Sequence, residues 1–168
     1  MGKIKELFNK YREIILYLVF GVLTTLVGFG FKFAILAAWK IAFSIPAEDT
    51  ESAMYLSGAY IAQAVSWVAA VLFAFFTNRK WVFTSAEKNV SIPLQLAKFA
   101  GGRVATGVIE FVCTPLCTLA IGILVPVTAS TTLLMWNLAE LIATLAVAVV
   151  VVILNYIFSK LLVFTKKK

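Results

Sequence analysis

Four long apolar segments, separated by short polar stretches, dominate the hydrophobic pattern of the chain. They are Ile14–Trp39, Ser57–Thr77, Leu94–Leu124 and Leu133–Phe158. Each reaches the ~20 residues that a helix needs to cross a hydrocarbon core of ~30 Å. The pattern therefore predicts an all-α integral membrane protein with four transmembrane helices. The third segment is over-long, so we expect it to begin as an interfacial turn, to kink near Pro115 and to end before Pro126.

The charged residues between these segments predict the orientation of the chain. Basic residues gather before the first segment, between the second and third, and after the fourth, whereas the loop after the first segment contains Glu48, Asp49 and Glu51. Cytoplasmic loops of membrane proteins carry an excess of Lys and Arg. We therefore expect both termini and the middle loop to be cytoplasmic and the acidic loop to lie outside.

Composition narrows the classes of function. Of 168 residues, 62% are hydrophobic and 14% charged, and 15 basic against 8 acidic residues give a net charge of +7. A basic chain can indicate a nucleic-acid partner, but the apolar majority argues for membrane lipids and against nucleic acid. The chain contains no His, which excludes histidine bases, Ser-His-Asp triads and His-ligated metals. We expect neither enzymatic activity nor a metal or other cofactor.

An internal repeat emerges when the chain is aligned with itself at an offset of 81 residues. Gly21 then matches Gly102, Thr25 matches Thr106, and the tripeptide Val82–Thr84 matches Val163–Thr165. The pattern predicts one transmembrane domain over residues 1–168, built from repeats at about 11–84 and 92–165. Two helices per repeat give both halves the same orientation, so we expect a parallel repeat with a substrate route near the interface between the halves or between subunits.

Several motifs resemble those of the GtrA-like family. The chain reads YLVFGVLTTLVGFGF from Tyr17 and NRKWVF at Asn78–Phe83, and its second half contains KFAGGRVATG and then NYIFSKLLVF at Asn155–Phe164. The resemblance implies a multi-pass protein of the bacterial cytoplasmic membrane that moves a polyprenyl-phosphate-linked sugar across it, for glycosylation of cell-surface polysaccharide or teichoic acid. The motif residues of interest are Asn78, Trp81, Phe83 and Asn155, although Ser159–Leu162 replaces Asn-Arg-Lys-Trp in the second copy.

Four formal charges fall inside the apolar segments: Lys32, Arg103, Glu110 and Glu140. At a helix centre each costs ~2.5–3.5 kcal/mol, so each needs a partner or a water-filled cavity. One interpretation is that Lys32 bonds Glu110 or Glu140 and only fixes helix packing. A further set of polar residues, Gln63, Thr106 and Asn137, shares the same spans, with Asn137 and Glu140 expected on one face of the fourth helix.

The alternative interpretation is a lipid site. Arg103, together with Lys98, Arg79 and Lys80, would meet a lipid phosphate from the cytoplasmic side, because the guanidinium offers a planar fork for phosphate oxygens. The sugar hydroxyls would be bound by Gln63, Thr106, Asn137 and the carboxylates, while the polyprenyl tail follows the small-residue groove Gly21–Gly28. Arg79 and Lys80 could equally be topology and headgroup anchors.

Two other functions stay open. Glu110 or Glu140 could exchange protons in a small proton-coupled exporter of drugs or cations, although Arg103 and Lys32 discourage a cationic substrate. The chain could also be a membrane scaffold that recruits a glycosyltransferase. Whichever function applies, we expect a homo-oligomer, because four helices leave little room for a sealed polar path.

Overall fold

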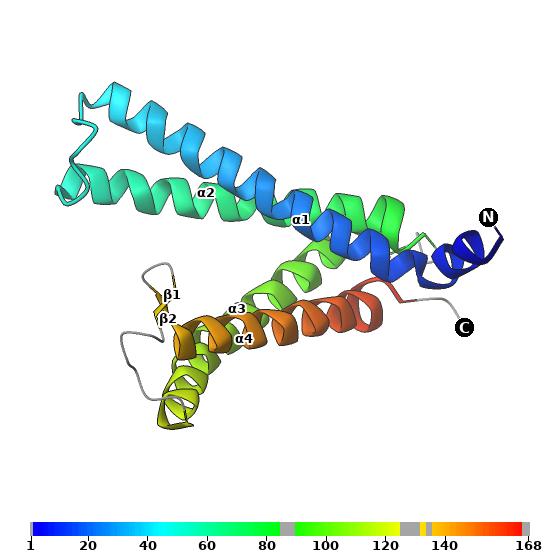
Figure 1. Cartoon of the computed structure of the whole chain (residues 1–168). Coiled ribbons are helices and arrows are strands. Elements are labelled where there is room, and N and C mark those ends of the chain that lie inside the picture. The colour runs from blue at the N-terminus through cyan, green and yellow to red at the C-terminus, as the bar shows by residue number, and fades with distance from the viewer. Residues whose placement is uncertain (1, 85–89, 125–131, 134–135, 166–168) are drawn as a thin grey trace. The chain divides into compact units, whose positions relative to one another are not determined.

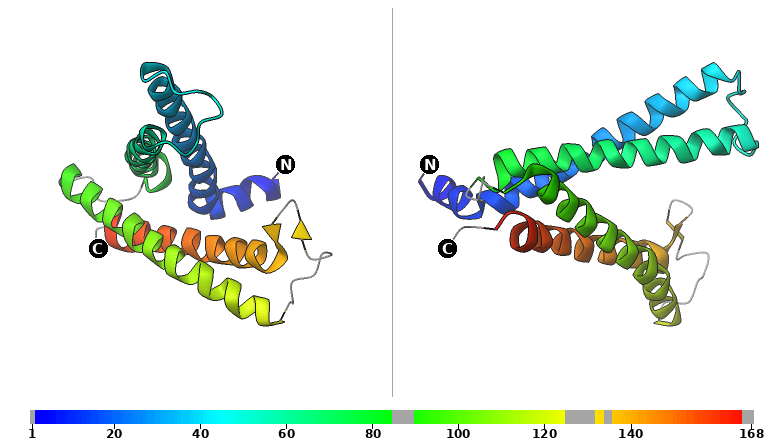
Figure 2. Two further views of the ribbon diagram at one scale, coloured as in Figure 1. Left: turned by 90° about the vertical axis from the view of Figure 1, so that its left-hand side faces the viewer. Right: turned by 180° about the vertical axis from the view of Figure 1, so that it is seen from behind.

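The computed structural model describes residues 2–84, 90–124, 132–133 and 136–165, with side chains described for 6–84, 90–123 and 141–165 (Figure 1). Contacts divide the chain into two compact units, Met1–Ala86 and Glu87–Lys168. Each unit contains one pair of long helices that run antiparallel (Figure 2).

The first unit consists of α1 (Gly2–Ala42), α2 (Ala53–Thr77) and the π-helical turn η1 (Asn78–Val82). α1 is longer than the apolar segment because the basic N-terminal stretch is helical as well. Tyr11, with φ −107° and ψ 15°, departs from helical geometry inside α1. The departure falls where the polar start of the helix meets its apolar part.

The second unit contains α3 (Ile92–Leu124), two paired strands β1 (Thr132–Leu133) and β2 (Trp136–Asn137), α4 (Leu138–Phe158) and the π-helical turn η3 (Ser159–Val163). α3 is helical from Ile92 and continues through Pro115. The interfacial position of its first turn and the kink near Pro115 remain predictions. Pro126 lies outside the described residues.

The fourth helix begins later than the apolar pattern suggests. Trp136 pairs with Leu133 in an antiparallel register, so the chain is extended before Leu138. Thr and Trp fit a paired extended backbone well. The expectation that Asn137 belongs to the fourth helix is therefore wrong, since it lies in β2.

The four predicted spans are confirmed. Among the described residues, four helical stretches are long and apolar enough to cross a membrane, and each leaves most of its apolar surface uncovered. They are Glu6–Ala42, Ala53–Val82, Ile92–Ile123 and Leu141–Val163. Side chains that a soluble protein would bury are thus available to lipid.

A ridge of small residues runs along α2 at every fourth position. It comprises Gly58, Ala62, Ser66, Ala70 and Ala74, of which all but Ala70 are buried. Residues four apart lie on one helix face, and small side chains allow the two backbones of a membrane helix pair to approach closely. The equivalent ridge of α4 keeps Ala143 but has larger side chains at Val147, Val151 and Asn155, and all four residues are buried.

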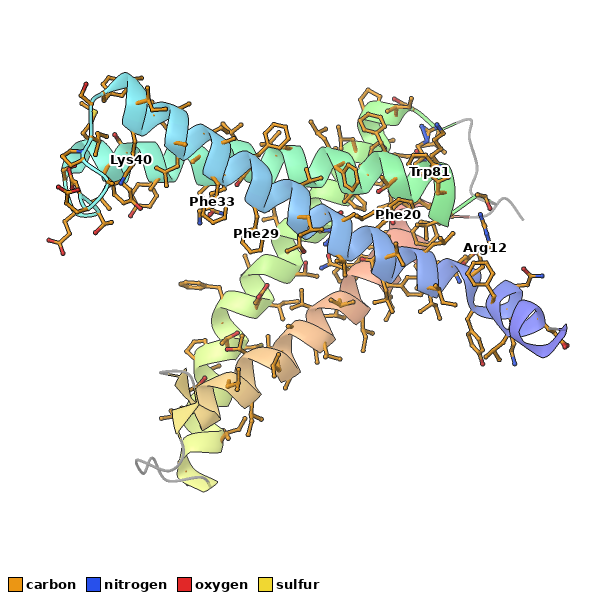
Figure 3. The ribbon with its side chains drawn as sticks, turned by 45° about the horizontal axis from the view of Figure 1, so that its top comes forward. Arg12, Phe20, Phe29, Phe33, Lys40 and Trp81 are labelled. Carbon is orange, nitrogen blue, oxygen red and sulfur yellow. The ribbon has the colours of Figure 1, made fainter. Side chains whose placement is uncertain are left out.

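Hydrogen bonds stabilise the loop that connects α1 and α2. The Trp39 indole Nε1–H donates to the Met54 carbonyl over 3.0 Å, and the Lys40 ammonium donates to the carbonyls of Pro46 and Ala47 over 3.2 and 2.9 Å. A methyl group on Gly58 would overlap the Trp39 ring, so this close approach requires glycine. Figure 3 shows Lys40 at this end and Arg12 with Trp81 at the other.

Candidate functional site

A cleft lies between the two helices of the first unit; most of its lining surface is apolar, and several polar side chains border it. From α1 it is lined by Thr24, Thr25, Gly28, Phe29 and Lys32, and from α2 by Gln63, Ser66, Trp67 and Ala70. Its volume is about 360 Å³, at the small end of the roughly 300–1,000 Å³ of ligand pockets. We refer to it as the α1–α2 cleft.

The side chains around the α1–α2 cleft offer one cation, one amide and three hydroxyls. The hydroxyls of Thr24, Thr25 and Ser66 donate to carbonyls of their own helices over 2.7, 3.2 and 2.9 Å. Their oxygen lone pairs remain able to accept a further hydrogen bond. The side chains of Lys32 and Gln63 bond no other residue in the part of the chain that the structure describes. An anionic, hydroxyl-rich ligand suits this set of groups.

The structure brings together residues that the sequence had placed on separate helices. Lys32, Gln63 and Gly28 line one cleft, whereas Gly21, expected in the same groove, is not among the lining residues. Ser66 and Trp67 also line the cleft, although the sequence analysis did not select them as site residues. They follow Gln63 at three and four positions, which puts all three on one helix face, so the signal was present in the spacing.

The NRKWVF motif forms the turn η1. Its backbone closes with a bond from the Phe83 N–H to the Asn78 carbonyl over 2.9 Å, and both side chains are buried. Trp81 stacks on Phe20 of α1, with ring centroids 5.4 Å apart and planes at 11°. Arg12 donates to the Trp81 carbonyl over 3.3 Å (Figure 3). The motif therefore ties the end of α2 to α1.

Within the second unit, η3 has the same local structure as η1 has within the first. The Phe164 N–H donates to the Ser159 carbonyl over 2.8 Å. The Phe164 ring packs on the Phe99 ring, with centroids 6.2 Å apart and planes at 55°. In the first unit the Phe83 ring packs on the Tyr17 ring in the same way, with centroids 6.4 Å apart and planes at 55°. The turn forms with either motif, so the departure of the second copy from Asn-Arg-Lys-Trp does not disturb its backbone.

Arg103 is half-buried about three turns into α3. Its guanidinium lies over the Phe99 ring, 5.2 Å from the centroid, which is a cation–π geometry. None of its N–H donors bonds another residue that the structure describes. The five donors of the fork are therefore open to an anion.

The other expected phosphate contacts lie on different units or faces. Lys98 is exposed on α3, five residues before Arg103, which separates the two on the helix face. Arg79 is half-buried, and the exposed Lys80 lies 4.8 Å from the Trp81 ring centroid in the first unit. The grouping of all four basic residues remains a prediction.

Thr106 and Asn155 form a buried pair across α3 and α4. The Thr106 hydroxyl is 2.9 Å from the Asn155 amide oxygen, and the residues are 1% and 6% exposed. The Thr106 hydroxyl thus joins the two helices of the second unit through the Asn155 side chain. The expected contact between Thr106 and a sugar hydroxyl remains a prediction.

The two carboxylates expected inside the membrane belong to the second unit. Glu110 is exposed on α3, and Glu140 lies in α4. The side chains of Glu140 and Asn137 lie outside the described residues. Lys32 belongs to the first unit, so its pairing with either carboxylate remains a prediction.

The fold and these sites define a multi-pass membrane protein with charged groups inside its apolar helices. A family model described as "GtrA/DPMS, transmembrane domain" matches residues 16–164. The chain belongs to this family, which confirms the resemblance seen in its motifs.

Curated relatives of similar length come from bacteria. The chain is 29% identical to the cell wall teichoic acid glycosylation protein GtcA of Listeria innocua serovar 6a, and 30% identical to GtcA of Listeria monocytogenes, in both cases over all of either chain. It is 27% identical to the membrane protein YwcD of Bacillus subtilis, over 91% of this chain and 97% of that protein. No solved structure is significantly similar.

Proposed function

We propose that the protein moves a polyprenyl-phosphate-linked sugar across the bacterial cytoplasmic membrane, where the sugar then serves the glycosylation of teichoic acid or another surface polymer. The similarity to GtcA over the whole chain supports the process. The protein acts on the lipid without chemical change, and a membrane glycosyltransferase uses the product. Both termini and the middle loop face the cytoplasm.

The observation that carries this proposal is Arg103. This half-buried guanidinium lies inside a helix that can span a membrane, and its N–H donors bond no other described residue, so an anion would stabilise it. A lipid phosphate supplies two oxygens in the geometry that a guanidinium fork accepts. The Phe99 ring beneath the guanidinium holds it in place while the N–H groups bind.

The test combines a cellular and a reconstituted measurement. Full-length protein with Arg103→Gln should be inserted normally but should lose most surface-polymer glycosylation in cells that lack the native gene, and translocation of a polyprenyl phosphate hexose in vesicles should fall at least tenfold. Arg103→Lys keeps the charge and loses the fork, so it should be intermediate. Normal glycosylation with well-expressed Arg103→Gln would refute the role of Arg103.

Two outcomes distinguish the other functions. A scaffold would co-purify with a glycosyltransferase and would support glycosylation in cells, yet vesicles containing the purified protein would show no translocation. A proton-coupled exporter would show proton-dependent efflux that Glu110→Gln abolishes. Neither result is expected under the present proposal.

A further inference from the structure

Part of the α1–α2 cleft lining differs from the matching positions of the second helix pair. At the offset of 81 residues, Lys32 corresponds to Cys113, Ser66 to Val147 and Trp67 to Ala148, whereas Thr25 corresponds to Thr106. Val147 is buried in the α4 ridge. The ammonium, the Ser66 hydroxyl and the indole are therefore particular to the first pair and are not a requirement of packing two such helices.

Lys32 has no counter-ion in its own hairpin. The sequence contains no Asp or Glu between Glu13 and Glu48, and α2 contains none over Ala53–Thr77. Lys32 lies ten residues from the end of α1, and Gln63 lies ten residues from the start of α2. Both are thus about 15 Å from the loop end of the hairpin. A single positive charge inside a membrane span, placed in an open cleft, is stabilised by water or by an anionic ligand.

The remaining groups of the cleft match a sugar. The Gln63 amide is exposed and can both donate and accept, and the hydroxyls of Thr25 and Ser66 can accept. Trp67, whose side chain is 42% exposed, offers an aromatic face and an N–H donor that bonds no described residue. Ring faces of this kind pack on the C–H face of a sugar while the polar edge bonds a hydroxyl. The volume of about 360 Å³ suits one sugar ring with its phosphate.

We propose that the α1–α2 cleft is a binding site for the headgroup of a polyprenyl monosaccharide phosphate, with the phosphate at the Lys32 ammonium and the sugar at Gln63 and Trp67. This inference rests on the proposed function, and it adds a site in the membrane half nearer the α1–α2 loop. The prenyl chain leaves the cleft past the exposed ring of Phe29 into lipid. In this proposal the headgroup has two binding sites, one in the α1–α2 cleft and one at Arg103.

Binding can be measured by native mass spectrometry of the full chain in nanodiscs. The probes are a polyprenyl phosphate hexose, the same polyprenyl phosphate without sugar, and the competitors hexose 1-phosphate and inorganic phosphate. Lys32→Gln should weaken binding of both lipids about tenfold, the loss expected for one charge-assisted hydrogen bond. Lys32→Arg should restore it, and Gln63→Leu should weaken binding of the sugar-bearing lipid only.

The matched control is Lys10→Gln, which removes one positive charge from α1 outside the cleft. It should leave both affinities unchanged. Unchanged lipid binding by Lys32→Gln would overturn the inference. Displacement of the lipids by hexose 1-phosphate or inorganic phosphate at equal concentration would show that the site takes soluble phosphates, which would overturn the lipid assignment.

The competing explanation of Lys32, an ion pair with Glu110 or Glu140, has its own signature. Lys32→Gln would then lower thermal stability with lipid affinity intact, and adding Glu110→Gln or Glu140→Gln would restore stability, which overturns the inference. If the unchanged protein binds neither lipid, the proposed function fails and the cleft assignment fails with it. If Arg103→Gln abolishes lipid binding and Lys32→Gln does not, only the cleft assignment fails.

Discussion

The hydroxyl of Thr106 lies 2.9 Å from the amide oxygen of Asn155, and both side chains are buried between α3 and α4. We expect Thr106→Val to lower the free energy of unfolding by about 0.5–2 kcal/mol, because the amide loses its partner in an apolar setting. A double-mutant cycle with Asn155→Leu, followed by unfolding in mixed micelles, measures the coupling. Additive losses would show that the two side chains do not interact.

Gly58 permits the Trp39 indole to lie against α2. Gly58→Ala should destabilise the protein by about 1–3 kcal/mol, because the added methyl overlaps the ring. Thermal unfolding of the purified protein gives the size of the effect. Gly30→Ala is the matched control, since the added methyl there would lie within 4 Å of nothing beyond its chain neighbours and its own turn of helix. It should be neutral or slightly stabilising. Equal losses at both positions would contradict the packing described here.

Asp49 caps the backbone before α2, where its Oδ1 accepts N–H bonds from Glu51 and Ser52 over 3.2 and 3.0 Å. Hydrogen bonds from the hydroxyl and then the backbone N–H of Ser52 hold the Asp49 pKa below its ordinary value. A lowered pKa means that the cap stabilises the fold above the ordinary Asp pKa of about 3.9 and is lost as the pH falls through the lower folded value. Carboxyl NMR titration should show a higher Asp49 pKa in Ser52→Ala, and an unchanged value would refute this cause.

Trp81 stacks on Phe20, whereas the corresponding position of the second hairpin is Leu162. Trp81→Leu should therefore lower the free energy of unfolding by about 0.5–1.5 kcal/mol, because the ring contact is lost, and should leave the turn η1 intact. Hydrogen exchange of the Phe83 N–H reports on the turn, since this group bonds the Asn78 carbonyl. Loss of its protection at unchanged global stability would show that the turn itself requires Trp81.

Hydrophobic pattern predicts the helices of this protein better than their ends. The four spans follow from length and apolar content alone, because a membrane demands both. The late start of α4 does not, since Leu133 and Trp136 are as apolar as the helix that follows and only their pairing makes them extended.

The sequence identifies the residues of the candidate site but not which of them lie close together in space. Lys32 and Gln63 are recognisable because charged and amide groups are rare inside membrane spans. Helical periodicity gives the face on which each lies, yet it does not say which two faces meet. The role of Thr106 needed the structure for the same reason, because its partner Asn155 is 49 residues away.

Contacts at both ends of the α1–α2 helix pair, the first helical hairpin, affect how the chain can fold during synthesis. Trp39 and Lys40 bond the loop at one end, while Arg12 and Trp81 join the helices at the other, and all four residues precede Glu87. During synthesis the N-terminal part of a chain folds first. The first hairpin can therefore complete its internal contacts in the bilayer while the ribosome is still translating the second, so biogenesis can proceed one hairpin at a time.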